Sequence, residues 1–180
     1  MLAAAEKYFD GKRPGAMADE DLLLKAKLLV QKGEDAAELR KLDESLSFRE
    51  AAFAATGELV SRRPRGPERL FAHGQSAFWV GDLHWRRADL DQANYYFGVY
   101  RAMSERVVAV KPDYPGALSE TAYAKTNLGQ VIIEQFGDTQ SASALFADAI
   151  RIVEPEAKDT EAKRNLSLIL GYQAQAVAQF

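Results

Sequence analysis

The sequence predicts an all-α fold, a right-handed α-α superhelix (solenoid) of antiparallel helical hairpins with about seven helices. Three observations predict this fold: an internal repeat, apolar residues spaced three or four positions apart, and helix-breaking residues between the apolar stretches. The strict alternation of apolar and polar residues that marks a strand appears nowhere over a useful length.

The internal repeat has a period of 48 residues. Five pairs of identical residues are separated by that distance: Val60 and Val108, Pro64 and Pro112, Pro67 and Pro115, Leu70 and Leu118, and Gly81 and Gly129. A shorter third copy follows, because Gly129 and Gly171 lie 42 residues apart and Pro112 and Pro155 lie 43 apart. Repeats of this length are typical of stacked supersecondary units.

Within each copy the apolar spacing is helical. After Asp89, for example, one stripe of apolar residues recurs at positions 93, 97, 100, 103, 107 and 110. We expect helices at 20–38, 41–62, 68–87, 90–110, 117–136, 140–153 and 159–179. Residues 1–18 are expected to form a short helix and a linker, and residues 19–180 the repeat domain.

Breakers separate the predicted helices. Proline pairs at 64 and 67 and at 112 and 115, and Pro155 near the end, each stop one helix and allow the next to start, because proline is excluded from a helix interior. Gly137 provides a further stop, and Asp138 or Thr139 is expected to cap the helix that follows.

Two sets of residues resemble the signature of the tetratricopeptide repeat family. They are Val80, Gly81, Ala93, Phe97 and Pro112, and then Asn127, Leu128, Gly129, Gly137, Asp138, Ala142, Phe146, Ala149 and Pro155. The resemblance covers roughly residues 20–180 and is strongest over 75–156. Independently, Gly81 or Gly129 opposite Ala93 or Ala142 would let two helix backbones approach closely, with Phe97 or Phe146 packed beside them.

The sequence also departs from this family. The usual period is 34 residues, and the 14 extra residues amount to nearly four helical turns, or about two per helix. Long-helix hairpins are therefore expected. The tryptophan and tyrosine common in the family's first helix are replaced by Ala77 or Lys125 and by His84 or Ile132.

The resemblance implies a binding surface on the concave side, lined by the first helix of each hairpin. The implied partner-binding residues are Gln75, Phe78, Asp82 and Trp85, then Tyr123, Thr126, Asn127, Gln130 and Ile133, and then Asn165, Leu168 and Tyr172. A non-catalytic interaction or scaffolding module that binds a peptide, a helix or a partner domain is the favoured function. The lysine–asparagine clamp that holds a C-terminal carboxylate in some family members is missing.

Composition excludes several classes of function. A net charge of −3 and a pI near 5.5 argue against nucleic-acid binding, which needs a basic face. With no cysteine, there is no disulfide, thiolate nucleophile or cysteine metal site. The N-terminus lacks the order of a secretory signal, and no apolar run approaches the ~18 residues of a membrane span. We expect a cytoplasmic protein that binds no membrane.

The sequence contains no pattern of an enzyme or cofactor site. His73 and His84 are the only histidines, and their separation of about 16 Å along one helix prevents them from sharing a metal ion. No phosphate-binding loop or nucleophile elbow is present. The alternative to an interaction module is a small-molecule sensor or enzyme that uses an aromatic pocket around Phe78, Trp85 and His84.

Two clusters have both a structural and a functional interpretation. Arg62, Arg63, Arg65 and Arg69 could bind an anion, but we favour ordinary helix-end and solvent contacts. Seven aromatic residues, at positions 78, 79, 85, 95, 96, 97 and 100, crowd the second hairpin. We favour core packing for most of them and leave open an exposed aromatic contact for a partner.

The predicted last helix keeps its apolar stripe as far as Val177 and Phe180. Solenoid ends normally carry a polar cap. Residues 159–179 therefore form a cap, belong to a longer chain, or form a homodimer through this helix. We favour the second of these: the chain would be a piece of a larger bacterial protein, and would serve in that protein as a sensor or regulatory module.

Overall fold

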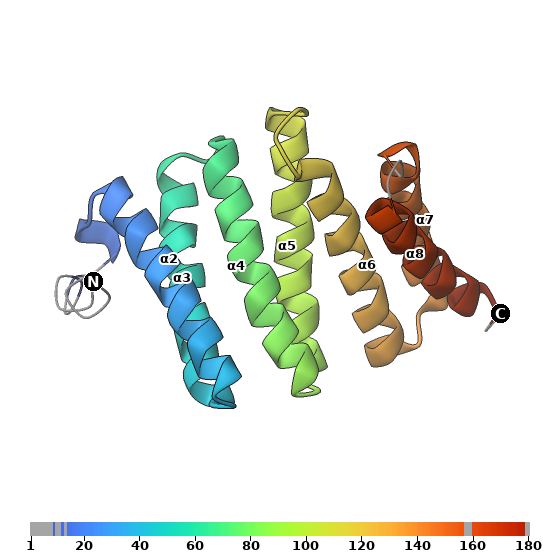
Figure 1. Cartoon of the computed structure of the whole chain (residues 1–180), viewed down its shortest axis with the longest axis horizontal. Helices are drawn as coiled ribbons and strands as arrows, with labels where there is room; N and C mark the ends of the chain where they lie inside the picture. Colours follow the sequence, from blue (N-terminus) through green and yellow to red (C-terminus); the bar gives the residue numbers. More distant parts are fainter. Residues whose placement is uncertain (1–8, 10–11, 13, 157–159, 179–180) are drawn as a thin grey trace.

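The computed structural model describes residues 9, 12, 14–156 and 160–178. The described part contains seven α-helices and no strand, which confirms the predicted fold class (Figure 1). The elements are η1 Pro14–Ala16, α2 Asp19–Glu38, α3 Leu42–Arg62, α4 Pro67–Arg86, α5 Leu90–Val110, α6 Ala117–Phe136, α7 Thr139–Val153, η2 Glu154–Glu156 and α8 Thr160–Ala178. Every predicted helix boundary lies within one residue of the observed one.

The helices form a row of hairpins in chain order (Figure 1). α2 packs on α3, α4 on α5, and α6 on α7, and each hairpin packs on the next through α3 with α4, α5 with α6, and α7 with α8. Beyond these sequential pairs, α4 also contacts α6, and α6 contacts α8. The even-numbered helices therefore approach one another along one side of the row, which we call the inner face.

Helix length follows the period of the repeat. The helices α2 to α6 have 20 or 21 residues each, as the 48-residue unit requires. α7 has only 15, which accounts for the shorter third copy. The period of the sequence therefore reports directly on helix length in this fold.

The three hairpin turns repeat one backbone conformation. Arg40, Ala88 and Gly137 all have positive φ, at 58°, 57° and 65°, and they lie 48 and 49 residues apart. Only the third turn uses the glycine that this left-handed conformation favours. The expected aspartate cap is present after it, because the Asp138 carboxylate accepts a hydrogen bond from the Ser141 amide at 3.0 Å.

Each of the two central hairpins has a glycine where its helices cross. A Cβ atom at Gly81 would lie 2.9 Å from Phe97 Cδ1, and one at Gly129 would lie 2.6 Å from Phe146 Cε1. Both rings are fully buried. The predicted packing of Phe97 and Phe146 beside these glycines is thus confirmed, and the nearest contact of each glycine is the ring and not Ala93 or Ala142.

The N-terminal segment packs on the first hairpin where it is described. Phe9 and Met17 are buried against Leu22, Ala26 and other residues of α2 and α3. The short helix expected within residues 1–18 lies largely outside the described residues. Met17 therefore belongs to the core and is not part of a loose linker.

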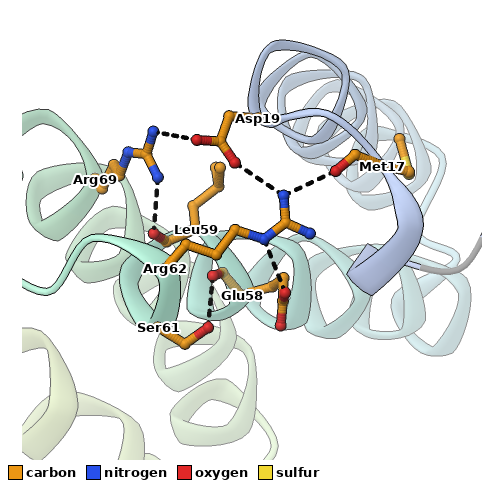
Figure 2. A network of polar contacts seen from close by, with 7 residues as sticks. All are labelled: Met17, Asp19, Glu58, Leu59, Ser61, Arg62 and Arg69. Carbon is orange, nitrogen blue, oxygen red and sulfur yellow. Dashed lines mark hydrogen bonds and ion pairs between the residues drawn. The ribbon is translucent and has the colours of Figure 1, made fainter.

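Two of the four clustered arginines bind the start of α2, as Figure 2 shows. Asp19 accepts hydrogen bonds from Arg62 Nη1 at 2.8 Å and from Arg69 Nη2 at 2.6 Å. Arg62 also donates to the Met17 carbonyl oxygen at 2.8 Å, and Arg69 to the Leu59 carbonyl oxygen at 3.1 Å. Arg62 and Arg69 thus join α2, α3 and α4. The expected solvent contact was wrong for Arg69, because its guanidinium group is held in this tertiary network.

The network predicts a specific dependence of stability on pH. Hydrogen bonds from Arg62 and Arg69 lower the pKa of Asp19 below its ordinary value of 3.8. A lowered pKa stabilises the folded state fully above 3.8, and this contribution disappears as pH falls through the lowered pKa. In urea unfolding, Asp19→Asn should therefore destabilise the protein at pH 7 and have a smaller effect at pH 3.

The matched control is Asp43→Asn, which removes an exposed ion pair with Arg87 at 2.8 Å. Such pairs contribute ~0–1 kcal/mol. An effect of Asp19→Asn that is equal at pH 7 and pH 3 would contradict the assigned role of the Arg62 and Arg69 contacts.

Candidate partner-binding face

The inner face has a continuous stripe of polar and aromatic side chains on α6. The stripe consists of Glu120, Tyr123, Asn127, Gln130 and Glu134, spaced three or four residues apart and partly or fully exposed. Tyr123, at the second position, is 40% exposed. Since α6 lies between α4 and α8, this stripe forms the middle of the inner face.

Hydrogen bonds join the α6 stripe to both neighbouring helices. Gln75 Nε2 on α4 donates to the Glu120 carboxylate. Trp85 Nε1, also on α4, donates to Glu134 Oε2 at 2.7 Å. On the other side, Asn165 Nδ2 of α8 donates to Tyr123 Oη at 2.6 Å. Gln75, Trp85, Tyr123 and Asn165, which were all predicted to bind a partner, therefore take part in hydrogen bonds between α6 and the helices beside it.

Glu120 receives a second hydrogen bond from inside the protein. Its donor is the hydroxyl of Tyr100, which is buried on α5. Burial raises the pKa of the Tyr100 phenol, and the neighbouring Glu120 carboxylate raises it further. Tyr100 therefore stays protonated and remains a donor, which fixes Glu120 at the edge of the inner face.

A cavity of about 350 Å³ lies where α4, α6, α7 and α8 meet, and we call it the α8 cavity. It is lined by Trp85, Gln130, Ile133, Glu134, Phe146, Tyr172, Gln175 and Ala176. Four of these residues, Trp85, Gln130, Ile133 and Tyr172, were predicted from the sequence. The exposed side chains of Glu134 and Gln175 place its mouth at the protein surface.

A second cavity, of about 220 Å³, lies between α2, α3 and α4, and we call it the α2 cavity. Its walls are mostly apolar: Leu23, Ala26, Lys27, Val30, Thr56, Ala72, Gln75, Ser76 and Trp79. Gln75 was predicted to lie on the binding face, but no role was predicted for α2. The inner face thus carries two cavities, one on either side of α4, and each has a tryptophan in its wall.

Some predicted site residues do not lie where the resemblance implies. Thr126 is only 6% exposed, and its hydroxyl donates to the Ala122 carbonyl oxygen at 2.9 Å. It cannot contact a partner, so this prediction was wrong. Phe78 packs against the core, with its ring centroid 5.4 Å from that of Tyr100. Asp82 is paired with Arg86 at 3.0 Å.

The remaining predicted residues stay accessible to different degrees. Asn127, Gln130, Asn165 and Tyr172 are half-buried, and Leu168 is exposed. Leu168 belongs to a set of exposed apolar residues on α8 that also includes Leu170 and Val177. These side chains would be available for the homodimer contact that the sequence left open.

Neither of the two cavities is lined by Phe78, Trp85 and His84 together. Trp85 lines the α8 cavity, whereas Phe78 and His84 do not. The His84 ring is buried, stacks on Tyr96 with centroids 5.7 Å apart, and places Nδ1 3.0 Å from Asp89 Oδ2. A small-molecule site around these three residues stays a prediction.

His73 also has a packing role. Its ring stacks on Phe53 with centroids 4.4 Å apart, and its Nδ1 lies 3.0 Å from Thr56 Oγ1. Burial lowers the pKa of His73 to about 4, so the ring is neutral at physiological pH. In the part of the chain that is described, no three His, Cys, Asp or Glu residues are grouped as metal ligands would be.

Most of the aromatic cluster belongs to the core, as favoured from the sequence. Phe97 and Tyr100 are buried, and Phe78 and Trp85 pack against the same core cluster. Tyr95 is the exception at 59% exposure, and it lies on α5, away from the inner face. The aromatic residues left for a partner on this face are Trp79, Trp85 and Tyr172 at the cavities, and the exposed Tyr123 on α6.

Two acidic residues of the face were not predicted from the sequence. Glu120 and Glu134 have the same helical spacing as Tyr123, Asn127 and Gln130, and this spacing was the signal that could have identified them. Each carboxylate accepts its interhelical hydrogen bond from a neutral donor on α4. The α6 stripe therefore has a negative charge at either end.

Comparison with known proteins gives no identification: a scan against models of protein families finds no match, and a search among curated proteins finds none either. None of the described helices combines the length and the apolar character that a bilayer crossing needs. The geometry of the inner face is therefore the basis for assigning a function.

Proposed function

We propose that this protein is a non-catalytic protein–protein interaction module of the tetratricopeptide-like kind. Its inner face would bind a segment of a partner protein. The observation that carries the proposal is the pair of cavities on either side of α4, each with a tryptophan in its wall. Tryptophan and tyrosine at a cavity are the residues that most often dominate the binding energy of interfaces.

The organisation of the face supports this proposal. Hydrogen bonds from Gln75, Trp85 and Asn165 hold the α6 stripe in place, so little conformational entropy would be lost when a partner binds. Volumes of about 220 and 350 Å³ lie below or at the lower end of the ~300–1,000 Å³ range of small-molecule sites, which leaves room for single side chains of a partner. A partner segment would insert side chains into the two cavities and lie across α4 between them.

The test uses random twelve-residue peptides displayed on phage and selected on the immobilised chain. Selected peptides are then titrated against Gln175→Trp, which adds a large side chain at the rim of the α8 cavity. We expect Gln175→Trp to raise the Kd at least tenfold, because the added indole would occupy the space that the peptide needs.

The matched control is Gln92→Trp, which makes the same exchange at an exposed position on α5. It should change the Kd less than twofold, and both variants should unfold at the same temperature as the parent protein. If no peptide is selected, or if both variants bind like the parent, the inner face is not the binding surface.

A further inference from the structure

The walls of the α8 cavity combine three aromatic rings with one carboxylate. Trp85, Phe146 and Tyr172 provide the rings, and Glu134 provides the negative charge. Two amide side chains, Gln130 and Gln175, complete the polar part of the lining. None of the described lining residues is positively charged.

The charge of Glu134 is not balanced within the described part of the protein. Its carboxylate accepts a hydrogen bond from the neutral indole of Trp85 at 2.7 Å, and none of the ion pairs between described residues involves it. The side chain is exposed, so the carboxylate stands at the mouth of the cavity. A cation entering here would meet this negative charge first.

The aromatic rings favour the same kind of ligand. The π face of an aromatic ring is negative and attracts a cation placed over it, and tryptophan attracts it most strongly. The Trp85 indole is held by its bond to Glu134 and by an edge contact with Phe97, with centroids 5.9 Å apart. Tyr172 is held by Phe146, with centroids 6.0 Å apart. Both rings therefore have fixed positions in the wall.

We propose that the α8 cavity binds the cationic side chain of a lysine or arginine in the partner segment. The inference rests on the proposed function and adds the chemistry of one anchoring residue. An anionic side chain would be repelled by Glu134. A purely apolar one would cover the polar groups of Glu134 and Gln130 without bonding to them, which is unfavourable. The guanidinium group of arginine can both stack on an aromatic ring and pair with a carboxylate.

The binding chemistry is tested first with a small probe. The chain has only two tryptophans, so its indole N–H groups give two NMR signals, from Trp79 and Trp85. Titration with Nα-acetyl-arginine amide should shift the Trp85 signal and leave the Trp79 signal unchanged. Nα-acetyl-citrulline amide, which has nearly the same shape and no charge, should shift neither.

The variant Glu134→Gln retains an acceptor for Trp85 and removes the charge. It should weaken binding of the arginine probe at least fivefold. The matched control Glu50→Gln removes an exposed charge of the same sign on α3 and should leave binding unchanged. Equal shifts with the citrulline probe, or equal affinity in Glu134→Gln, would overturn the proposal.

The source of the cation is tested with the peptides selected by phage display. We expect them to contain a lysine or arginine whose replacement by norleucine or citrulline raises the Kd at least tenfold in the parent protein. The same replacement should raise it less than threefold in Glu134→Gln. If peptides that bind the inner face keep their Kd when every basic residue is replaced, the proposal of a cationic side chain in the α8 cavity is wrong and the proposed function stands. If no peptide binds and the arginine probe still does, the cavity binds small cations only, and both proposals fail.

Discussion

Replacing Gly129 with alanine is expected to destabilise the fold by about 1–3 kcal/mol, the usual cost of overpacking a core. The added methyl group would lie 2.6 Å from Phe146 Cε1 and 3.0 Å from Cζ. Because the Phe146 ring is fully buried, it cannot turn into solvent, and α6 and α7 would have to separate. This cost should exceed the ~1 kcal/mol by which alanine normally favours a helix over glycine.

The repeat itself provides the control for this experiment. Gly171 occupies the matching position in the third copy, and a Cβ atom placed there meets nothing within 4 Å. Gly171→Ala should therefore stabilise the protein by up to ~1 kcal/mol. Urea unfolding followed by circular dichroism measures both free energies. Opposite signs are expected, and a stabilised Gly129→Ala variant would show that α6 and α7 can separate at their crossing at little cost.

Truncating Phe97 to alanine is expected to have a still larger effect on the free energy of unfolding, a loss of about 3–5 kcal/mol. The ring is fully buried in the largest core cluster, next to Phe78 and Trp85, where α4 and α5 cross at Gly81. Its removal leaves a cavity that rigid helices cannot close. Since domains are stable by only about 5–15 kcal/mol, much of the protein should unfold under mild denaturation.

A double-mutant cycle tests the cause of this effect. Gly81→Ala alone should destabilise the protein, because its Cβ atom would lie 2.9 Å from Phe97 Cδ1. In the Phe97→Ala background the same substitution should cost less or even stabilise, because the obstructing ring is gone. Additive effects of the two substitutions, measured by urea unfolding, would contradict the direct contact between them.

The fold could be predicted to this accuracy because its signals are local. Proline pairs and the Gly137 stop fix where helices end through backbone geometry alone, and no tertiary contact overrides them. The turn at Ala88 has no glycine or proline, yet the repeat indicates its position to within one residue, because Ala88 lies 49 residues before Gly137. A 48-residue period can therefore substitute for a missing turn signal.

The binding face was predicted less completely because the rotation of each helix depends on packing. At 100° per residue, Thr126 lies about 80° from the mean direction of the α6 stripe, which is enough to turn its side chain toward the neighbouring helices. Glu120 and Glu134 lie nearer to the centre of the stripe. The sequence did not predict them, because acidic residues on a helix are usually solvated. The structure shows that each accepts a hydrogen bond from a donor on α4.

The mainly sequential packing of the helices also has a consequence for how the chain folds. Each helix packs mainly on the one before it and the one after it, so the contacts that define the fold close short loops. Proteins dominated by such contacts fold fast, and a linear array can nucleate at any unit and propagate to its neighbours. The helices α4 and α5 share the most extensive contact of any pair of described helices, so this hairpin should open last. The α8 cavity is formed in part by α8, which packs mainly on α7, so fluctuations of α8 would govern how quickly a ligand enters and leaves.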